Sequence, residues 1–287
     1  MTTETRPCGH GHSGDIEYAW AIDLGLQRTP PNEDALDLCK IALPDGRHAL
    51  LLTVADGLGG GANGEKASAI AVAEIVACAD HLAEDAAVLD WSAARQTLAD
   101  AFARADQAIR DRASADRERP GATTLVTALI VESTILHLYV GDSRLYLLGA
   151  AGVEHRTRDQ TLAQVQLEVG NIKSEEEATP RQRNTLFAVV GGDRSSLSIE
   201  PTWTPDPPSP LLTLEPDRTL LLCSDGLWGQ IGRERLVALA VDLETDLPAI
   251  CQRLLAEVRN NGAPDNIAMI LARRAKPVQG ATVTGDM

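Results

Sequence analysis

Aspartates stand repeatedly at the ends of apolar segments, usually with a glycine beside them. A single Asp-Gly pair most often forms a turn, because both residues suit turn geometry. Several such pairs at strand ends would instead hold short carboxylates on a rigid frame, with glycine allowing the backbone to approach a ligand. The positions are Leu50–Ala55 followed by Asp56-Gly57, Ile135–Val140 followed by Gly141-Asp142, Leu220–Ser224 followed by Asp225-Gly226, and Asn32-Glu33-Asp34 and Asp265-Asn266 before two further segments.

Carboxylates gathered in one place repel each other, and their pKa values rise unless a cation offsets the charge. A set of oxygen ligands without converging histidine or cysteine favours hard ions such as Mg²⁺ or Mn²⁺. Aspartates shared by two such ions, about 3.5–4 Å apart, would suit hydrolytic displacement at phosphorus. Turns and helix caps are the alternative interpretation of the same residues, and the spacing alone leaves both open.

The chain of 287 residues carries 26 Lys and Arg against 41 Asp and Glu, which gives a net charge of −15. This excess of acid repels phosphate backbones and anionic lipid, so it argues against a nucleic-acid or membrane-surface partner. The longest apolar run, near Leu125–Val131, is far shorter than the roughly 18 residues of a membrane span. Most of the acidic residues are expected to form a solvated surface, and a few could gather around cations.

The amino terminus lacks the apolar core of a secretory signal, and the five cysteines are scattered without a C-x-x-C pair. Both features predict a cytoplasmic protein whose thiols are mostly buried. Residues 1–16 and 275–287 are polar and are predicted to be disordered tails.

Short apolar runs bounded by turn signals predict strands, and longer amphipathic stretches predict helices. The predicted strands are Tyr18–Leu26, Ala35–Ala42, His48–Ala55, Thr123–Val131, Ile135–Val140, Arg144–Leu148, residues 196–204, Thr219–Ser224 and Asn266–Ala272. The predicted helices are Glu65–His81, Trp91–Arg112, Arg233–Val241 and Leu247–Arg259. Separate blocks of strands and helices indicate an α+β fold. Because no linker divides the chain, we expect one domain over residues 17–274.

In their order along the chain, these residues resemble the bacterial form of the metal-dependent serine/threonine protein phosphatases of type 2C. The similarity extends over about Tyr18–Arg273, and the ordered set of short stretches is highly specific. The matching stretches are Asp23-Leu24-Gly25, Arg28, Asn32-Glu33-Asp34, Val54–Gly60, Gly64–Ser68, Gly121–Leu125, Val140–Tyr146, Thr157–Gln160, Arg183-Asn184, Leu222–Leu227 and Asp265–Ile267.

The resemblance implies two stacked antiparallel β-sheets flanked by helices, an α-β-β-α sandwich with a centre of two Mn²⁺ or Mg²⁺ ions at one end. It also implies a third, weaker ion. The ligands it implies are Asp56 as the bridge between the ions, Asp225 and Asp265 on the first ion, Asp34 and the carbonyl of Gly57 on the second, and Asp142 with Asp225 on the third.

The reaction that the resemblance implies is hydrolysis of phosphoserine and phosphothreonine in proteins. The ions lower the pKa of a bridging water, and the resulting hydroxide attacks phosphorus in line, so that no protein nucleophile is required. Arg28 would clamp the phosphate, since a guanidinium pairs with two of its oxygens, and Glu33 would contribute through water. The implied partners are phosphorylated proteins and a cognate Ser/Thr kinase in a signalling pathway, and a monomer is favoured.

The sequence departs from the family pattern at a few positions. Three residues, Thr29–Pro31, separate Arg28 from Asn32 where the family usually has two. Gly61 and Gln160 stand where histidine is common, so no histidine is identified as the acid for the leaving oxygen. Residues 157–190 correspond to the flap of the family, a variable excursion that helps to select substrates. Its acidic run, residues 175–177, is expected to be a solvated turn.

Two other classes of function stay open on the sequence. One is a non-enzymatic regulator that uses this scaffold to bind a phosphoprotein or a kinase. The other is a two-metal hydrolase of a different phosphoester, such as a nuclease, which the charge of −15 disfavours. Because all the principal metal positions are present, an active enzyme is the first expectation.

Overall fold

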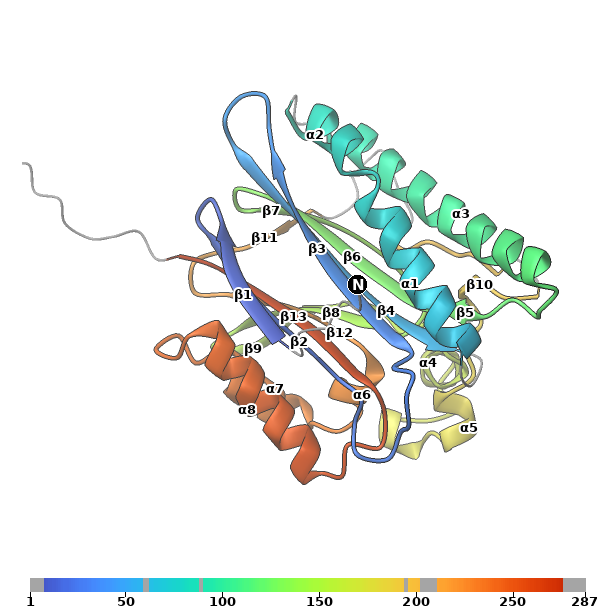
Figure 1. Cartoon of the computed structure of the whole chain (residues 1–287). Coiled ribbons are helices and arrows are strands. Elements are labelled where there is room, and N and C mark those ends of the chain that lie inside the picture. The colour runs from blue at the N-terminus through green and yellow to red at the C-terminus, as the bar shows by residue number, and fades with distance from the viewer. Residues whose placement is uncertain (1–7, 59–61, 88–89, 194–195, 202–210, 276–287) are drawn as a thin grey trace, which may run out of the picture.

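The computed structural model describes residues 8–58, 62–87, 90–193, 196–201 and 211–275. Two antiparallel β-sheets lie face to face, and helices cover the outer face of each sheet (Figure 1). The layers therefore run helix, sheet, sheet, helix. This arrangement confirms the predicted α+β sandwich.

The first sheet contains six strands in the order β1-β2-β13-β12-β8-β9, and all neighbouring strands are antiparallel. Its strands are β1 (Cys8–Ser13), β2 (Ile16–Asp23), β8 (Arg144–Gly149), β9 (Gly152–Arg156), β12 (Thr219–Cys223) and β13 (Ile267–Arg274). Every residue of β8 and β12 is buried. Most side chains of these two strands are apolar because one side packs on the second sheet and the other on helices, and Arg144 at the start of β8 is a buried charge.

The second sheet follows the order β10-β5-β4-β6-β7-β11, and β3 pairs with β4. Its strands are β3 (Asp34–Ala42), β4 (His48–Leu58), β5 (Ala122–Thr123), β6 (Leu125–Val131), β7 (Thr134–Val140), β10 (Val190–Gly191) and β11 (Leu212–Thr213). The turn that joins β3 to β4 contains Gly46, whose N–H donates to the carbonyl of Leu43 at 3.0 Å. An apolar core of leucine, isoleucine, valine and alanine side chains lies between the two sheets.

Three helices cover the outer face of the second sheet: α1 (Ala62–Val76), α2 (Ala79–Ala87) and α3 (Trp91–Asp116). Helix α3 begins at Asp90, whose carboxylate accepts hydrogen bonds from the first turn of backbone N–H groups. The apolar side chains along one face of α3 are buried, among them Leu98, Ala105 and Ile109, and Phe102 is one of the largest fully buried side chains. The aromatic residue in the middle of this helix therefore packs in the core.

The outer face of the first sheet is covered by α6 (Asp225–Trp228), α7 (Arg233–Ala240) and α8 (Leu247–Asn260). Helix α8 begins at Asp246, whose carboxylate accepts from the N–H of Ala249 at 2.7 Å. The short helix α6 follows β12 directly and was not predicted. Its first residue, Asp225, is one of the predicted site residues.

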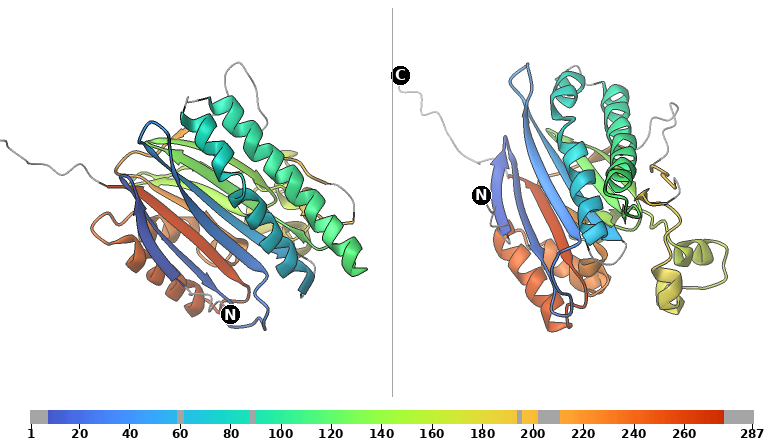
Figure 2. Two further views of the ribbon diagram at one scale, coloured as in Figure 1. Left: turned by 45° about the horizontal axis from the view of Figure 1, so that its top comes forward. Right: turned by 45° about the vertical axis from the view of Figure 1, so that its right-hand side comes forward.

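The flap, residues 157–190, projects from one side of the sandwich (Figure 2). It contains α4 (Leu162–Glu168), a 3₁₀ turn (Glu175–Glu177) and α5 (Pro180–Arg183). Thr179 and Gln182 form a capping box at the start of α5, which explains why so short a helix forms there.

The amino-terminal segment corrects the prediction of a disordered tail over residues 1–16. Cys8–Ser13 form β1, an edge strand paired with β2. Gly9 and Gly11 lie against aromatic rings: a Cβ would approach Trp20 Cε2 to 2.7 Å and Tyr18 Oη to 2.5 Å, respectively. The glycines suggested a flexible tail, but they allow this strand to pack against the two rings.

Other predicted elements need smaller corrections. The predicted helix Glu65–His81 is two helices, because a turn at Ala77 and Cys78 separates α1 from α2. Strand β9 was not predicted. In the described part of the predicted strand 196–204, residues 196–201, Glu200 makes a single bridge to Tyr139 in place of a strand. Residues 1–7, 202–210 and 276–287 of the predicted tails and connection lie outside the described residues.

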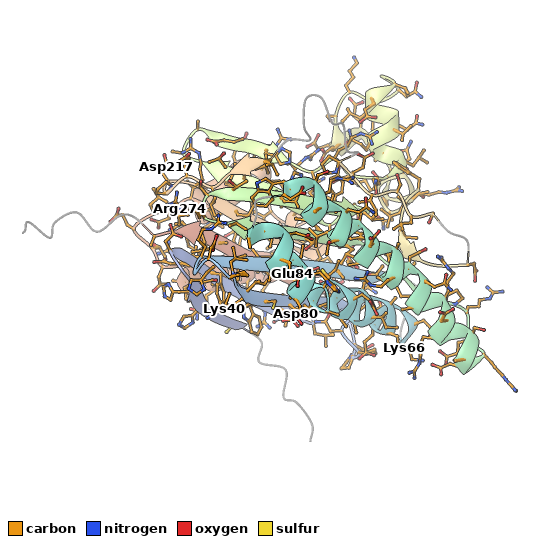
Figure 3. The ribbon with its side chains drawn as sticks, turned by 90° about the horizontal axis from the view of Figure 1, so that it is seen from above. Lys40, Lys66, Asp80, Glu84, Asp217 and Arg274 are labelled. Carbon is orange, nitrogen blue, oxygen red and sulfur yellow. The ribbon has the colours of Figure 1, made fainter. Side chains whose placement is uncertain are left out.

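Charged side chains lie on the outside of the helical layers. Viewed from above, Lys40, Asp80 and Glu84 lie near α2 and the edge of the sheet beneath it (Figure 3), and all three are exposed. Such positions account for acidic residues as solvated surface. Among the described residues, no helix is both long enough and apolar enough to span a bilayer.

Candidate metal centre

The hairpin of β3 and β4 supplies two carboxylates that face each other. Asp34 lies directly opposite Asp56 in the strand register, and side chains of such a pair lie about 4.5–5.5 Å apart. The N–H of Asp56 donates to Thr124 Oγ1 at 3.0 Å. Ser224 Oγ, from the other sheet, donates to Asp34 Oδ2 at 2.6 Å. Both sheets therefore fix this pair.

Asp225 and Asp265 reach the site from the first sheet. Asp225 begins α6 directly after β12, and Asp265 lies just before β13. Gly226 allows the two segments to meet, because a Cβ there would lie 1.8 Å from the carbonyl oxygen of Asn266. Asp225 lies close enough to Asp56 for its charge to raise the pKa of Asp56, in addition to the effect of burial, so the carboxylates of the two sheets interact.

Asn266 connects the loops that carry these carboxylates. Its Oδ1 accepts from the N–H of Glu33 at 2.8 Å, and its Nδ2 donates to the carbonyl of Leu24 at 2.9 Å. The carbonyl of Glu33 in turn accepts from the N–H of Gly57 at 3.0 Å. Sequence reasoning placed Asn266 in a motif but gave it no role. The side-chain amide of asparagine can both donate and accept hydrogen bonds, and this property could have indicated a bridging role from the sequence.

The predicted site residues meet at a cavity of about 180 Å³ at this end of the sandwich. Asp34 is absent from its wall, because it lies opposite Asp56 with 5% of its surface exposed. The structure thus brings all of the predicted residues together, and their roles as ligands stay predictions. Those in the wall are Arg28, Glu33, Asp56, Gly57, Asp142, Asp225 and Asp265.

The carboxylates raise one another's pKa values. Burial raises the pKa of Asp56 well above its usual range, and the charges of Asp34 and Asp225 add to the effect. Burial also raises the pKa of Asp34, although the hydrogen bond from Ser224 opposes it. Burial and the charge of Asp265 raise the pKa of Asp225 to about 6. A cation among these groups would stabilise their ionised forms.

Arg28 lies at the rim of the cavity. Its Nη2 donates to Asp265 Oδ2 at 2.8 Å, and its Nη1 is 3.8 Å from Glu33 Oε2. The hydrogen bond with Asp265 raises the pKa of Arg28 above its ordinary value. Its side chain is 43% exposed, so the guanidinium is accessible to an incoming anion. The three-residue spacer Thr29–Pro31 leaves Arg28 at the cavity.

Asp142 reaches the same cavity from the end of β7 and is 7% exposed. Burial and the charge of Asp225 raise its pKa well above the usual range. Gln160, which stands where the family often has histidine, fixes the turn that precedes Asp142. Its Oε1 accepts from the N–H of Gly141 at 2.7 Å, and its N–H donates to the carbonyl of Gly141 at 3.0 Å. Gln160 therefore positions Asp142 through the backbone.

The donor atoms at the cavity are oxygens, as hard divalent ions prefer. Across the described ranges, no three side chains of His, Cys, Asp or Glu converge as ligands of one ion. Mg²⁺ does not require such a group, because it is bound through one or two carboxylates and keeps several waters. Buried carboxylates whose pKa values are raised by like charges fit a pair of divalent ions.

A larger cleft of about 1,010 Å³ adjoins the cavity. Asp142, Asn184, Asp225 and Asp265 belong to the walls of both. The flap forms one side of the cleft, and α6 with the start of α7 forms the other. Sequence reasoning quoted Asn184 within a family stretch, and the structure places it at the junction of cavity and cleft.

A sandwich of this topology with carboxylates gathered at one end defines the class of type 2C phosphatase domains. The sequence description of the family "Protein phosphatase 2C" matches residues 26–272. The chain belongs to the protein phosphatase 2C family.

Among the curated relatives, the chain is 30% identical over 281 residues to the serine/threonine protein phosphatase PstP of Mycobacterium tuberculosis. The alignment covers 94% of this chain and 49% of PstP, so the chain spans about half the length of that relative. It is also 27% identical over 225 residues to the serine/threonine phosphatase stp of Listeria monocytogenes, covering 78% of this chain and 84% of stp.

Solved structures show the same fold. The serine/threonine phosphatase Stp1 of Staphylococcus aureus superposes with a TM-score of 0.74 at 26% identity, covering 93% of this chain and 99% of that one. The M. tuberculosis PstP/Ppp structure gives 0.71 at 26% identity, covering 91% and 99%. A structure of the PstP catalytic domain in complex with two manganese ions gives 0.65 at 24% identity, covering 91% and 99%.

Proposed function

We propose that the chain hydrolyses phosphoserine and phosphothreonine in proteins with the aid of two Mn²⁺ or Mg²⁺ ions. The observation that carries this proposal is the position of the partly buried Asp56 and Asp225 at one cavity, with the buried Asp34 opposite Asp56 and Arg28 at the rim. Membership of the protein phosphatase 2C family supports it, as do the names of the relatives and the manganese ions in the PstP structure.

Carboxylates from both sheets would hold the ions. When bound, the ions lower the pKa of a coordinated water and offset charge on the phosphoryl oxygens. Ser224 fixes Asp34 through a hydrogen bond of 2.6 Å, and the N–H of Asn266 fixes Asp265 through one of 2.8 Å. The proposed ligands are Asp56 between the ions, Asp225 and Asp265 on the first, Asp34 and the Gly57 carbonyl on the second, and Asp142 with Asp225 on a third, weaker ion.

Arg28 is proposed to orient the phosphate. In the structure its guanidinium already pairs with a carboxylate, that of Asp265, at 2.8 Å. A phosphate has the same pairing geometry and offers two oxygens at once, so it suits the exposed side of this guanidinium. Glu33, whose carboxylate lies 3.8 Å from Arg28, is placed to contribute through water.

The names of the relatives support a protein substrate. They are a serine/threonine protein phosphatase of Mycobacterium tuberculosis and a serine/threonine phosphatase of Listeria monocytogenes. Phosphorylated proteins are therefore the proposed substrates, and a Ser/Thr kinase that modifies the same proteins is the proposed counterpart. We propose that the chain acts as a monomer in the cytoplasm.

The proposal is tested by removing and restoring metal. The chain is treated with EDTA, dialysed, and assayed on a phosphothreonine peptide and on p-nitrophenyl phosphate. Turnover is expected after addition of Mn²⁺ or Mg²⁺, and background rates without them. Activity that survives chelation would contradict a metal-dependent mechanism. Calorimetric binding of Mn²⁺ without any turnover would instead favour a non-enzymatic regulator.

A further inference from the structure

A network of buried charges lies beside the metal centre and takes no part in the proposed chemistry. Arg144 on β8 donates from Nε to Asp159 Oδ1 at 2.8 Å and from Nη2 to Asp159 Oδ2 at 2.5 Å. Arg144 is 5% exposed and Asp159 6%. This pair anchors the start of the flap to the first sheet.

Glu175, in the 3₁₀ turn of the flap, adds its carboxylate to this network and contacts two arginines. Its Oε1 lies 2.6 Å from Nη1 of Arg156 on β9, and its Oε2 lies 3.3 Å from Nη2 of Arg144. Burial raises the pKa of Glu175, but the two arginines lower it below its ordinary value. One charged flap residue therefore bridges two arginines on neighbouring strands.

Glu175 differs in this respect from the other residues of the acidic run. Glu176 and Glu177 are exposed, as expected for a solvated turn. The carboxylate of Glu177 accepts a hydrogen bond from the N–H of Lys173 at 2.8 Å, within the flap itself. Glu175 instead contacts arginines of β8 and β9, so the expectation of a solvated turn is wrong for this residue.

The same network reaches the metal centre. The guanidinium of Arg144 stacks on the ring of Trp228 at 3.5 Å from its centroid. Trp228 Nε1 donates to the carbonyl oxygen of Asp142 at 3.1 Å. A line of direct contacts thus connects the flap, through Arg144 and Trp228, to a carboxylate residue of the cavity.

The charged network lines the cleft and not the cavity. Glu175, Arg144 and Arg156 line the cleft of about 1,010 Å³, and none of them lines the cavity of about 180 Å³. A small phosphate ester needs the cavity. A phosphorylated polypeptide must also pass along the cleft, so the position of the flap matters to the polypeptide.

We propose that Glu175 is a positioning residue that fixes the flap as the outer wall of the cleft, and that it thereby favours phosphorylated polypeptides over small phosphate esters. The inference rests on the proposed phosphatase function. Replacing Glu175 leaves the Arg144–Asp159 pair at the start of the flap intact, so the sandwich remains folded while the 3₁₀ turn of the flap loses its contacts to β8 and β9.

The first test compares Glu175→Gln with Glu177→Gln, which removes the same charge from the same turn but touches neither arginine. For Glu175→Gln, KM for a phosphothreonine peptide should rise about tenfold with kcat nearly unchanged, the pattern of lost substrate binding. Turnover of p-nitrophenyl phosphate should stay within about twofold of wild type, since that ester needs the cavity alone. Glu177→Gln should leave both substrates unaffected.

A second variant breaks the same contact from the sheet. Arg156→Gln leaves Glu175 with its contact to Arg144 and with a side chain that is 35% exposed, so no fully buried charge is left unpaired, and the variant should reproduce the peptide-specific rise in KM. Trypsin gives a readout without catalysis, because Lys173, Arg181 and Arg183 are exposed on the flap. Cleavage there should be faster in Glu175→Gln and Arg156→Gln than in Glu177→Gln, at temperatures where circular dichroism shows folded protein.

Two results would overturn the proposal: equal losses on peptide and small ester, or an unchanged peptide KM in Glu175→Gln. A wild-type chain that turned over neither substrate would count against the phosphatase function itself. In that case the trypsin comparison still decides whether Glu175 fixes the flap, and equal cleavage rates in Glu175→Gln and Glu177→Gln would show that it does not.

Discussion

Two groups of buried charge adjoin each other beside the flap, and they differ in how they are neutralised. Asp159 is bound by two N–H groups of Arg144, and Glu175 lies between Arg144 and Arg156. Asp56 has four aspartates and one arginine, Arg28 at the rim, as its charged neighbours, and burial together with the charge of the aspartates raises its pKa. The first group contains its own counter-charges, whereas the second has an excess of carboxylates.

The difference in neutralisation indicates a structural role for the carboxylates that are paired with arginine and a binding role for those that are not. A complete buried ion pair offers nothing to a further ligand, but breaking it leaves an unpaired charge in the interior. A buried group of like charges destabilises the fold until a cation arrives, and perturbed groups of this kind mark functional sites. Substitution at Asp56 and at Asp159 should therefore have opposite consequences for activity and stability.

The largest expected effect is the loss of activity in Asp56→Asn. Removing the proposed bridging ligand should lower kcat on p-nitrophenyl phosphate about 1,000-fold or more, equivalent to about 4 kcal/mol of activation free energy. The metal-free variant should melt at the same or a higher temperature than wild type, because one member of a repelling group is gone. Steady-state assays with Mn²⁺ and melting curves in EDTA check both parts. Retained turnover would remove Asp56 from the mechanism.

The reverse pattern is expected for Asp159→Asn. The change leaves Arg144 without its buried counter-charge and should lower the free energy of unfolding by about 3 kcal/mol. Well below its melting temperature, the variant should keep most of its turnover of p-nitrophenyl phosphate. The matched control is Glu168→Gln, which breaks the exposed pair with Arg158 and should cost less than about 1 kcal/mol. Equal shifts of the urea midpoint in both variants would contradict the comparison.

A smaller effect is expected for Arg28→Ala, at the boundary between the metal centre and the substrate. KM for a phosphothreonine peptide should rise about tenfold, because a phosphate contact is lost. The affinity for Mn²⁺ measured by calorimetry should change little. Arg259→Ala is the control, since Arg259 is also half-exposed and pairs with an aspartate, Asp23, but does not line the cavity. Unchanged kinetics in Arg28→Ala would separate this arginine from the site.

The carboxylates of the metal centre could be identified as candidates from the sequence. Each of these aspartates lies at or near the end of a predicted strand, so the strand pattern and the glycines made them candidates, with turns and caps as the alternative. Asp34 directly precedes one predicted strand and Asp56 directly follows the next, and the structure pairs the two residues. Blocks of strands and helices indicated an α+β fold, and the resemblance to the family added the two stacked sheets and the metal centre.

The ion-paired group of the flap was not predictable from the sequence in the same way. Glu175 lies in a polar run with two neighbours of the same type, and its two arginine partners are distant in sequence. Only the packing of the flap against β8 and β9 distinguishes it from Glu176 and Glu177. Strand β1 was missed for a related reason, because its glycines suit a strand only when aromatic rings lie beneath them.

The smallest expected effect concerns pH, and it arises from the incomplete neutralisation of the metal centre. Burial and Asp265 raise the pKa of Asp225 to about 6 from an ordinary value of 3.8. A raised pKa stabilises the metal-free fold fully below pH 3.8, and this contribution is lost as the pH rises through 6. A metal ion must displace the same proton, so metal affinity changes in the opposite direction, and acid weakens it.

The dissociation constant for Mn²⁺ should therefore increase about fourfold between pH 7 and pH 5.5, the effect of one proton competing with a pKa of about 6. Titration calorimetry at both pH values measures the change, and repetition in buffers of different ionisation enthalpy counts the protons released. Asp159→Asn should show the same pH dependence, because Asp159 is not among the proposed ligands. An affinity that is constant over this range, with no proton release, would show that Asp225 is already ionised in the metal-free protein.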